Sequence, residues 1–339
     1  MCGINGIFSK KELNFEERIS KMNDSIFHRG PDSGGIYIKN SIGLGHRRLS
    51  IIDVRDISNQ PMESNSGRFS IVFNGEIYNF IEIRQKLNYN FKTNSDTEVI
   101  LAAVEIYGID WFLKNANGMF SFAIYDNLKK SLTIARDRFG IKPLYYYHDE
   151  NKFIFSSEIK GILNSGLVKA EFEENAIDEY LANRYVREPF TFFKNIFQVK
   201  SANLIEIDSD LNFKSKIFWK ITSDFNLEKK YNEIKILNEF RNEIEKSIKY
   251  RQIADVEVGT YLSGGIDSSI ITGYSSIMSN KILNSYTIGF KDLNEFEYSD
   301  IVADKFQTCH HKILLKKEDY LMNWEKLIRF KDSPLGVPN

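Results

Sequence analysis

The spacing of hydrophobic residues changes along this chain of 339 residues, and that change constrains the fold more than any other feature. Before about residue 205, short runs rich in aromatic and β-branched residues recur between turns, as in β-strands. Many strands with few helices predict an α+β domain with antiparallel sheets. We expect strands at residues 3–8, 42–46, 69–73, 119–125, 131–136, 144–147 and 152–156, helices at 15–27 and from the capping-box sequence Ser95-Asp96-Thr97-Glu98 onward, and an irregular segment at 28–35.

After about residue 231 the pattern alternates between helix and strand, which is typical of βαβ units in a parallel sheet. Helices are expected at 234–248, from 268, at 297–306 and at 317–330, with strands at 257–262, 283–289 and 311–315. Between the two parts the periodicity is lost, and Lys, Asn and Ser become more frequent. We therefore predict two domains, at residues 1–205 and 231–339, joined by a linker at 206–230.

Charge and composition favour a soluble globular protein. The net charge is -1, so there is no electrostatic reason to expect a nucleic-acid partner. No stretch reaches the ~20 apolar residues of a membrane span, and no secretory signal is visible, so we expect no membrane contact and a cytoplasmic location. Cys2 and Cys309 are too few for a disulfide framework. Because adjacent strand residues alternate faces, Cys309-His310-His311 is not expected to bind one metal ion.

Cys2 is the first candidate functional residue. Removal of Met1 would place the thiol of Cys2 beside a free α-amine at the start of the chain. The thiolate is the reactive form, and an α-amine with a pKa of roughly 7.7–8.0 can take the thiol proton near neutral pH. Cys2 therefore predicts a nucleophile and its base in one residue. The alternative is a start Met followed by an ordinary apolar residue.

A second candidate site lies where a predicted strand ends and a predicted helix begins, at Leu262-Ser263-Gly264-Gly265-Ile266-Asp267-Ser268-Ser269. Backbone N–H groups freed by the glycines, together with the helix dipole, can hold a phosphate or pyrophosphate. The Gly-Lys-Ser/Thr of a Walker A loop is missing here, so we expect cleavage between the α and β phosphates, with Asp267 near a Mg²⁺. A Gly-Gly turn with capping serines is the alternative.

Several separated motifs point to one family. They are Met1-Cys2-Gly3-Ile4, His28-Arg29-Gly30-Pro31-Asp32, His46-Arg47-Arg48-Leu49-Ser50-Ile51-Ile52-Asp53, Phe73-Asn74-Gly75-Glu76-Ile77-Tyr78-Asn79, Ser95-Asp96-Thr97-Glu98 and Arg136-Asp137-Arg138-Phe139-Gly140-Ile141-Lys142-Pro143-Leu144-Tyr145-Tyr146. In this order the chain resembles the asparagine synthetase family of glutamine-dependent amidotransferases. The resemblance implies an α+β N-terminal-nucleophile αββα sandwich, the class II glutaminase domain, followed by an incomplete α/β adenine-nucleotide domain of the PP-loop pyrophosphatase type.

The resemblance also implies roles at a glutamine site. Cys2 would attack the side-chain carboxamide of glutamine, and the oxyanion hole would be the Asn74 side chain with the Gly75 N–H. Ammonia would leave, and a γ-glutamyl thioester would remain for water. Arg48 would fork onto the substrate α-carboxylate, or serve only as an ion-pair partner. Glu76 and Asp96 would hold the α-ammonium, although Asp96 could be only a helix-start charge. The pocket would be lined by the backbone of Leu49, Ser50, Ile51 and Ile52.

For the second domain the resemblance implies that ATP adenylates aspartate, and that ammonia then displaces AMP to give asparagine. Leu262 and Ile288 would contact adenosine. The pyrophosphate and Mg²⁺ would be held by Ser263, Gly264, Gly265, Asp267 and Ser268. The expected partners are therefore glutamine, ATP and aspartate, and a homodimer is left open.

The chain departs from the family's pattern at Asn339, before a second Ser-Gly-Glu-Gly-x-Asp-Glu loop that family members carry. We therefore expect a truncated gene product or a fragment. Two other functions stay open at this point. One is a related amidotransferase that amidates a sugar acid for a surface polysaccharide, and the other is a truncated glutaminase or a binding remnant.

Overall fold

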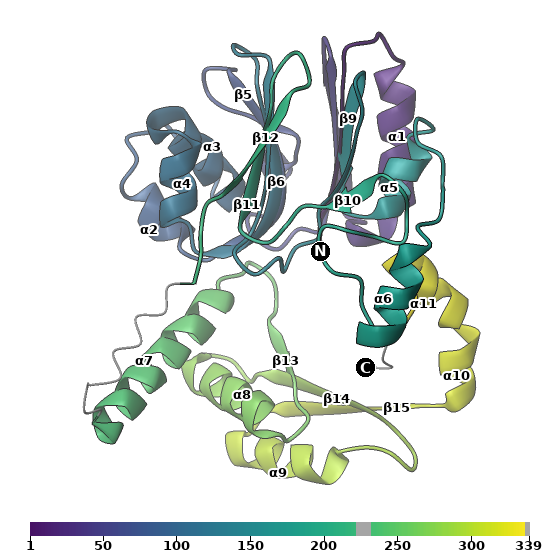
Figure 1. Ribbon diagram of the computed structural model, residues 1–339. Helices are drawn as coiled ribbons and strands as arrows, with labels where there is room; N and C mark the ends of the chain where they lie inside the picture. Colours follow the sequence, from purple (N-terminus) through teal and green to yellow (C-terminus); the bar gives the residue numbers. More distant parts are fainter. Residues whose placement is uncertain (222–231, 336–339) are drawn as a thin grey trace. The chain divides into compact units, whose positions relative to one another are not determined.

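A computed structural model describes residues 1–221 and 232–335 of the chain. The chain divides into two compact units (Figure 1). The first joins Met1–Thr222 with Lys331–Asn339, and the second is Ser223–Phe330. Within the described ranges, no helix combines the length and the apolar character needed to cross a membrane.

The first unit contains two antiparallel sheets of six strands each. In order across the first sheet these are β10 (Ile196–Gln198), β8 (Tyr145–His148), β9 (Lys152–Ser156), β1 (Gly3–Ser9), β3 (Ile42–Arg48) and β2 (Ser33–Lys39). Across the second they are β12 (Phe213–Ile217), β11 (Asn203–Ile207), β7 (Ser131–Arg136), β6 (Gly118–Asp126), β5 (Phe69–Ile77) and β4 (Met62–Glu63).

Helices cover the outer face of each sheet (Figure 1). The first sheet is covered by α1 (Phe15–Ser25) and α5 (Ile159–Asn164), and the second by α2 (Phe80–Arg84), α3 (Asp96–Tyr107) and α4 (Ile109–Asn115). The remaining helices of the first unit are η1 (Phe27–Arg29), η2 (Asp56–Ser58) and α6 (Asn175–Asn183). This is the four-layer αββα sandwich that the resemblance implied.

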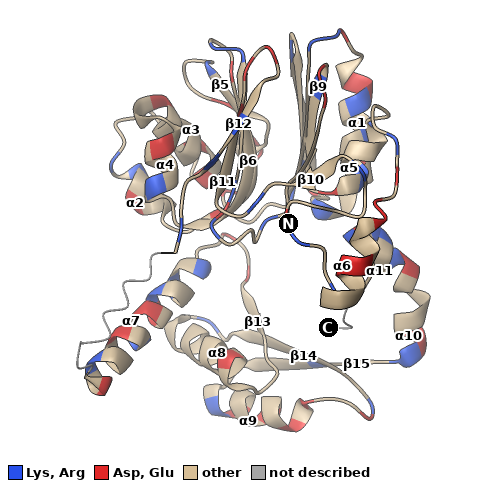
Figure 2. Cartoon of the chain, in the orientation of Figure 1, with Lys and Arg blue, Asp and Glu red and all other residues tan. Residues whose placement is uncertain are grey.

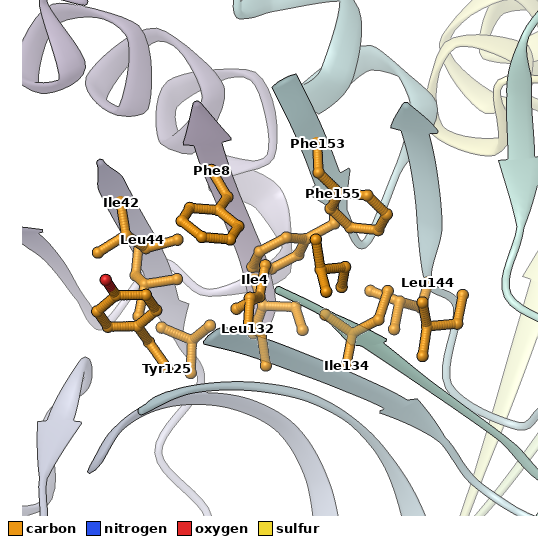
Figure 3. Close-up of a cluster of buried hydrophobic side chains, with 14 of the residues drawn as sticks. Ile4, Phe8, Ile42, Leu44, Tyr125, Leu132, Ile134, Leu144, Phe153 and Phe155 are labelled. Atoms are coloured by element: carbon orange, nitrogen blue, oxygen red, sulfur yellow. The ribbon is translucent and has the colours of Figure 1, made fainter. Parts of the chain in front are cut away.

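The alternation of side chains along the central strand β1 explains why both of its faces are buried. Ile4 and Phe8 point into the space between the two sheets, where they meet Ile134 and Tyr125 from the facing sheet (Figure 3). Ile7 points the other way, into a second cluster formed with α1 and α5. Because each face packs against a different layer, a shift of β1 by one residue would turn Ile4 and Phe8 toward the helices and Ile7 toward the facing sheet, and the register is therefore firmly set.

The second unit is built of alternating helices and parallel strands. Its sheet has the order β13 (Gly259–Tyr261), β14 (Asn284–Phe290) and β15 (Cys309–Leu315). Its helices are α7 (Glu233–Arg251), α8 (Ile266–Met278), α9 (Phe296–Phe306), α10 (Lys317–Met322) and α11 (Trp324–Lys331). Acidic and basic side chains are interspersed along α7 (Figure 2).

The expected strands and helices are all present, with differences at their ends and in three segments. Segment 28–35 is irregular only in part, because η1 extends to Arg29, and β2 begins at Ser33 and pairs with β3. The helix expected at 317–330 is two helices, α10 and α11, which are separated at Asn323, and there the Asn323 side chain also donates to the Asp319 carbonyl. The capping box at Ser95 is only half formed. The Ser95 hydroxyl accepts from the Thr97 N–H, whereas the Glu98 carboxylate instead accepts from backbone N–H groups that precede the helix.

The linker expected at 206–230 also differs from the structure. β12 lies inside that segment and pairs with β11 along its whole length. Beyond β12, the Phe218 ring stacks on Phe120 of β6, and the Phe218 N–H donates to the Ala202 carbonyl. The first unit therefore extends past residue 205, because these apolar contacts continue its second sheet. Residues 222–230 of the expected linker lie outside the described residues.

Candidate active site

A cavity of about 290 Å³ opens where the start of β1, the end of β3, the end of β5 and the start of α3 meet. Nine of the ten residues expected at a glutamine site line it, namely Cys2, Arg48, Leu49, Ile51, Ile52, Asn74, Gly75, Glu76 and Asp96. Ser50 is the exception, since it is not among the lining residues and its N–H donates to the carboxylate of Asp32. The fold thus brings together residues that are separated by up to 94 positions in the sequence.

Cys2 is held at the mouth of β1 by the backbone of Leu49. Its Sγ accepts from the Leu49 N–H at 3.4 Å and lies 3.5 Å from the Leu49 carbonyl oxygen. Burial raises the pKa of the Cys2 thiol, and burial lowers the pKa of the chain's α-amine at Met1. Both shifts disfavour the charged form of the group, so formation of a thiolate at Cys2 needs an arrangement that stabilises its negative charge.

The segment 28–32 fixes the backbone around the nucleophile. The Arg29 Nε–H donates to the Cys2 carbonyl at 2.9 Å, and the Arg29 guanidinium pairs with the buried carboxylate of Glu158. Gly30 passes so close to β3 that a Cβ would lie 2.3 Å from the Arg47 carbonyl carbon. Only a residue without a side chain fits there, so the motif His28–Asp32 serves to position Cys2 and the 49–50 turn.

Asn74 presents a side chain suited to an oxyanion hole. It is 1% exposed, it lines the cavity, and neither its Nδ2 nor its Oδ1 has a hydrogen-bond partner among the described residues. A buried amide without partners costs free energy, so its place beside Cys2 calls for a ligand that would complete it. Gly75 follows it where β5 and β6 touch. A Cβ at Gly75 would lie 2.3 Å from the Met119 carbonyl oxygen.

Arg48 is buried and is wrapped by the loop that follows β3. Its Nη1 donates to the Arg55 carbonyl and to the Asn59 side-chain oxygen, and its Nη2 donates to the carbonyls of Ile52 and Asp53. A guanidinium has five N–H donors, so only the Nε–H is left for a substrate in this arrangement. The two-pronged contact that the sequence predicted would require release of one loop carbonyl, and the Ile52 contact, at 3.4 Å, is the longest.

Asp96 lies at the first position of α3 and faces the same cavity. Its Oδ2 accepts from the Ile77 N–H at 3.0 Å, and burial, with a further contribution from the neighbouring Glu76 carboxylate, raises its pKa to about 7. Two carboxyl groups close together in a buried site can share a positive ligand. Asp96 and Glu76 are therefore arranged to take an ammonium group.

Several cavity residues were not expected from the sequence. They are Met1, Ser58, Gln60, Phe73, Ser95, Thr97, Met119, Ile141 and Lys142. Lys142 is the basic residue among these nine. It lies in the last of the motifs that carry the family resemblance, but the direction of its side chain depends on how the 137–142 loop folds back on β6.

The segment predicted as the second candidate site forms a turn at the start of α8. Leu262 is buried, and its N–H donates to the carbonyl of Tyr286 on the adjacent strand. Gly264 has a φ of 84°, a left-handed conformation that favours glycine, and a Cβ there would lie 2.5 Å from the Cβ of Tyr298. The hydroxyls of Ser263 and Ser268 hydrogen bond across the turn at 3.0 Å.

The open side of this turn can accommodate an anion. A Cβ added to Gly265 would meet nothing closer than the Ser263 Oγ at 3.4 Å. Asp267 is exposed in the first turn of the 13-residue helix α8, and Ile288 is exposed on β14. No cluster of three or more metal-ligating side chains occurs in the parts of the chain that the structure describes. A single carboxylate suits Mg²⁺ when phosphate oxygens and water supply the other ligands.

Comparison with known families matches both units. The family described as "Glutamine amidotransferase domain" matches residues 1–219, and the family described as "Asparagine synthase" matches residues 239–339. A relative from Methanocaldococcus jannaschii, named putative asparagine synthetase [glutamine-hydrolyzing] 2, is 37% identical over 99% of this chain and 69% of its own length. The chain belongs to the glutamine-hydrolysing asparagine synthetase family.

A second curated relative is also longer than this chain. Asparagine synthetase [glutamine-hydrolyzing] 1 of Bacillus subtilis is 35% identical over the whole chain, which spans only 54% of that relative's length. Among solved structures, the glutamine phosphoribosylpyrophosphate amidotransferase of B. subtilis is 17% identical, with 92% of this chain and 65% of that chain covered and a TM-score of 0.49. The synthetase-family chain thus spans about half to two thirds of the curated relatives it matches.

Proposed function

We propose that this chain hydrolyses glutamine at the cavity of the first unit, with Cys2 as the nucleophile, and that the ammonia serves an ATP-dependent ligase reaction on aspartate. One observation carries the first half of the proposal. The Asn74 amide is buried, has no partner among the described residues, and lines the same cavity as Cys2. Such a group is costly in the folded protein unless a ligand completes it, and an oxyanion beside the nucleophile would do so.

The proposed hydrolysis uses groups that already lie in the cavity. After Met1 is removed, the Cys2 amine takes the thiol proton, and Sγ forms a bond to the glutamine side-chain carbonyl carbon. The carbonyl electron pair moves to oxygen, which accepts hydrogen bonds from the Asn74 amide and the Gly75 N–H. When the intermediate collapses, the C–N bond breaks, and the amine returns its proton to the departing ammonia. Water then cleaves the γ-glutamyl thioester and releases glutamate.

The other end of the substrate is assigned to the opposite charges in the cavity. The α-carboxylate of glutamine would pair with Arg48, through its Nε–H and its net charge. The α-ammonium would lie between Glu76 and Asp96. This places the substrate between two fixed sites, because the Arg48 guanidinium is tied to its loop and Asp96 to the Ile77 N–H.

For the second half of the proposal, the Ser263–Ser268 turn would hold the phosphates of ATP. The turn lies at the N-terminus of α8, where backbone N–H groups favour an anion, and Asp267 would supply a ligand to Mg²⁺. Leu262 directly follows β13, and Ile288 lies on the adjacent strand β14. Both residues would flank the adenosine. ATP supplies the group that activates a carboxylate for attack by ammonia.

The experiment that tests this function measures two products in one reaction. The purified chain is given glutamine, and glutamate is quantified. ATP, Mg²⁺ and either aspartate or a uronic acid are then added, and AMP is measured. Glutamate release supports the glutaminase, and aspartate-dependent AMP supports the ligase. AMP that depends on the uronic acid would favour a sugar-acid amidotransferase, and no glutamate at all would refute the glutaminase.

The raised pKa of Asp96 predicts a pH dependence of glutamine binding. Because burial raises this pKa to about 7, the carboxyl group is neutral below pH 7 and ionised above it. Only the ionised form pairs with the substrate ammonium, so kcat/KM for glutamine is expected to fall as the pH drops through 7. Steady-state kinetics between about pH 5.5 and 8.5 would measure this profile.

Asp96→Asn is the control for this pH profile, because it keeps the shape of the side chain and removes the titration. The variant should show a high KM at every pH and should lose the step near pH 7. If the variant kept the same step, the titrating group would be a different one, such as the α-amine.

A further inference from the structure

A buried cation in the glutamine cavity has no role in the reaction proposed above. Lys142 is 4% exposed and lines the cavity together with Cys2 and Glu76. Its ammonium forms no ion pair with any described carboxylate, and its one hydrogen-bond partner there is the sulfur of Met1, at 3.2 Å. A thioether sulfur is a weak acceptor, and removal of Met1 would take even this contact away.

A structural role explains the backbone of Lys142 but not its charge. The Asp137 carboxylate accepts from the N–H groups of Lys142, Ile141 and Phe139, and it also binds β6 through the Phe120 N–H. The loop is therefore locked from its own start, without the lysine side chain. An uncharged residue of the same length would fill the space equally well, and burial of an unpaired ammonium is costly.

The loop also positions the lysine. The Arg136 guanidinium donates to the carbonyls of Lys142 and Gly140 and to that of Val199, so the loop is closed on three sides. The backbone at Lys142 is fixed by hydrogen bonds on both its N–H and its carbonyl, so its side chain starts from a fixed point in the cavity wall. An ammonium group already present in the cavity needs little reorganisation when an anion forms near it.

Charges of both signs face this part of the cavity. The chain's α-amine, Arg48 and Asp96 act on the Cys2 thiol. Glu76, Asp137, Arg29 and the Cys2 thiol act on the lysine. Burial lowers the pKa of Lys142, whereas Glu76, the Cys2 thiolate and Asp137 favour its ammonium form. The thiol and the lysine therefore influence each other, and each is the more stable in its charged form when the other is charged.

We propose that Lys142 is a positioning residue for the nucleophile, whose ammonium stabilises the thiolate form of Cys2. The same positive charge disfavours protonation of the α-amine at Met1, and it would act in the same direction on the Cys2 α-amine that removal of Met1 exposes. This inference rests on the proposed glutaminase function, because a stabilised thiolate is useful only if Cys2 is the nucleophile. The charge effect on the thiol is a property of the resting protein and is measurable without glutamine.

The test measures the reactivity of the Cys2 thiol directly. Protein carrying Cys309→Ser, so that Cys2 is the only thiol, is alkylated with iodoacetamide from pH 6 to 10, and the modified fraction is followed by mass spectrometry. In Lys142→Met the apparent thiol pKa is expected to rise by about one unit, with alkylation about tenfold slower at pH 7, because an opposite charge close by shifts a pKa by this much. Lys142→Arg keeps the charge and should keep most of the reactivity.

Lys86→Met is the matched control, since Lys86 is exposed and lies outside the cavity, and its alkylation profile should equal that of the parent. An unchanged profile in Lys142→Met would overturn the proposal. If Lys142→Met does not fold, Lys142→Gln takes its place with the same criterion. Loss of glutamine hydrolysis with an unshifted thiol profile would also reject this role, while a shifted profile in a chain without glutaminase activity would reject only the proposed function.

Discussion

Cys2→Ala is expected to reduce glutamate release from glutamine by a factor on the order of 10⁴ or more, since no other thiol lies in the cavity and loss of a nucleophile removes the covalent step altogether. The fold should survive. Cys2 lies just before the first strand residue, Gly3, and within the described part of the chain its Sγ makes two long hydrogen-bond contacts, both with Leu49. Glutamate production by the parent and the variant, with a thermal unfolding curve for each, measures both statements.

Cys309→Ala is the matched control for this prediction, because it removes the chain's other cysteine, which is exposed on β15. It should keep the parent's glutaminase rate. Glutamate release at the parent's rate in Cys2→Ala would refute the assignment of the nucleophile. The same samples show whether Met1 is removed, since full activity in protein that retains Met1 would exclude the α-amine of Cys2 as the base.

The order of motifs in the sequence predicted which residues meet in the cavity, but it could not predict how their donors are used. Arg48 illustrates the limit. Its identity and its place at the end of β3 were readable, whereas the loop that wraps it takes both of its terminal nitrogens through backbone carbonyls. Such contacts depend on the conformation of the loop. They use backbone carbonyls, which every residue has, so the residue types do not reveal them.

Lys142 and Phe218 are two further residues whose contacts could not be predicted from the sequence. The lysine lies within a motif that was identified, yet its place in the cavity wall depends on the loop whose backbone Asp137 and Arg136 hold, and only the folded loop reveals those hydrogen bonds. Phe218 lies in a segment without periodicity, and it extends the first unit because its ring meets Phe120 across the second sheet. Local patterns predict elements well, but contacts between distant segments decide where a domain ends.

Asn74 connects the energetics of the fold to the chemistry of the site. A side-chain amide with partners would stabilise the folded protein, and its removal would lower the free energy of unfolding. Asn74 has no partner among the described residues, so its replacement by alanine removes a buried polar group that contributes no hydrogen bond. This distinguishes a residue kept for the transition state from one kept for the fold.

Asn74→Ala is therefore expected to lower kcat by roughly 10²–10³-fold with a smaller change in KM, as loss of one oxyanion donor does, while the melting temperature stays the same or rises. Arg48→Ala provides the contrast in the same cavity. It should raise KM for glutamine more than it lowers kcat, since its contact exists before the transition state, and it should lower the melting temperature because four hydrogen bonds to the 52–59 segment are lost. Steady-state kinetics and thermal unfolding of both variants measure the difference. A near-normal kcat in Asn74→Ala would take this residue out of the oxyanion hole, and a fall in melting temperature like that of Arg48→Ala would make it a structural amide.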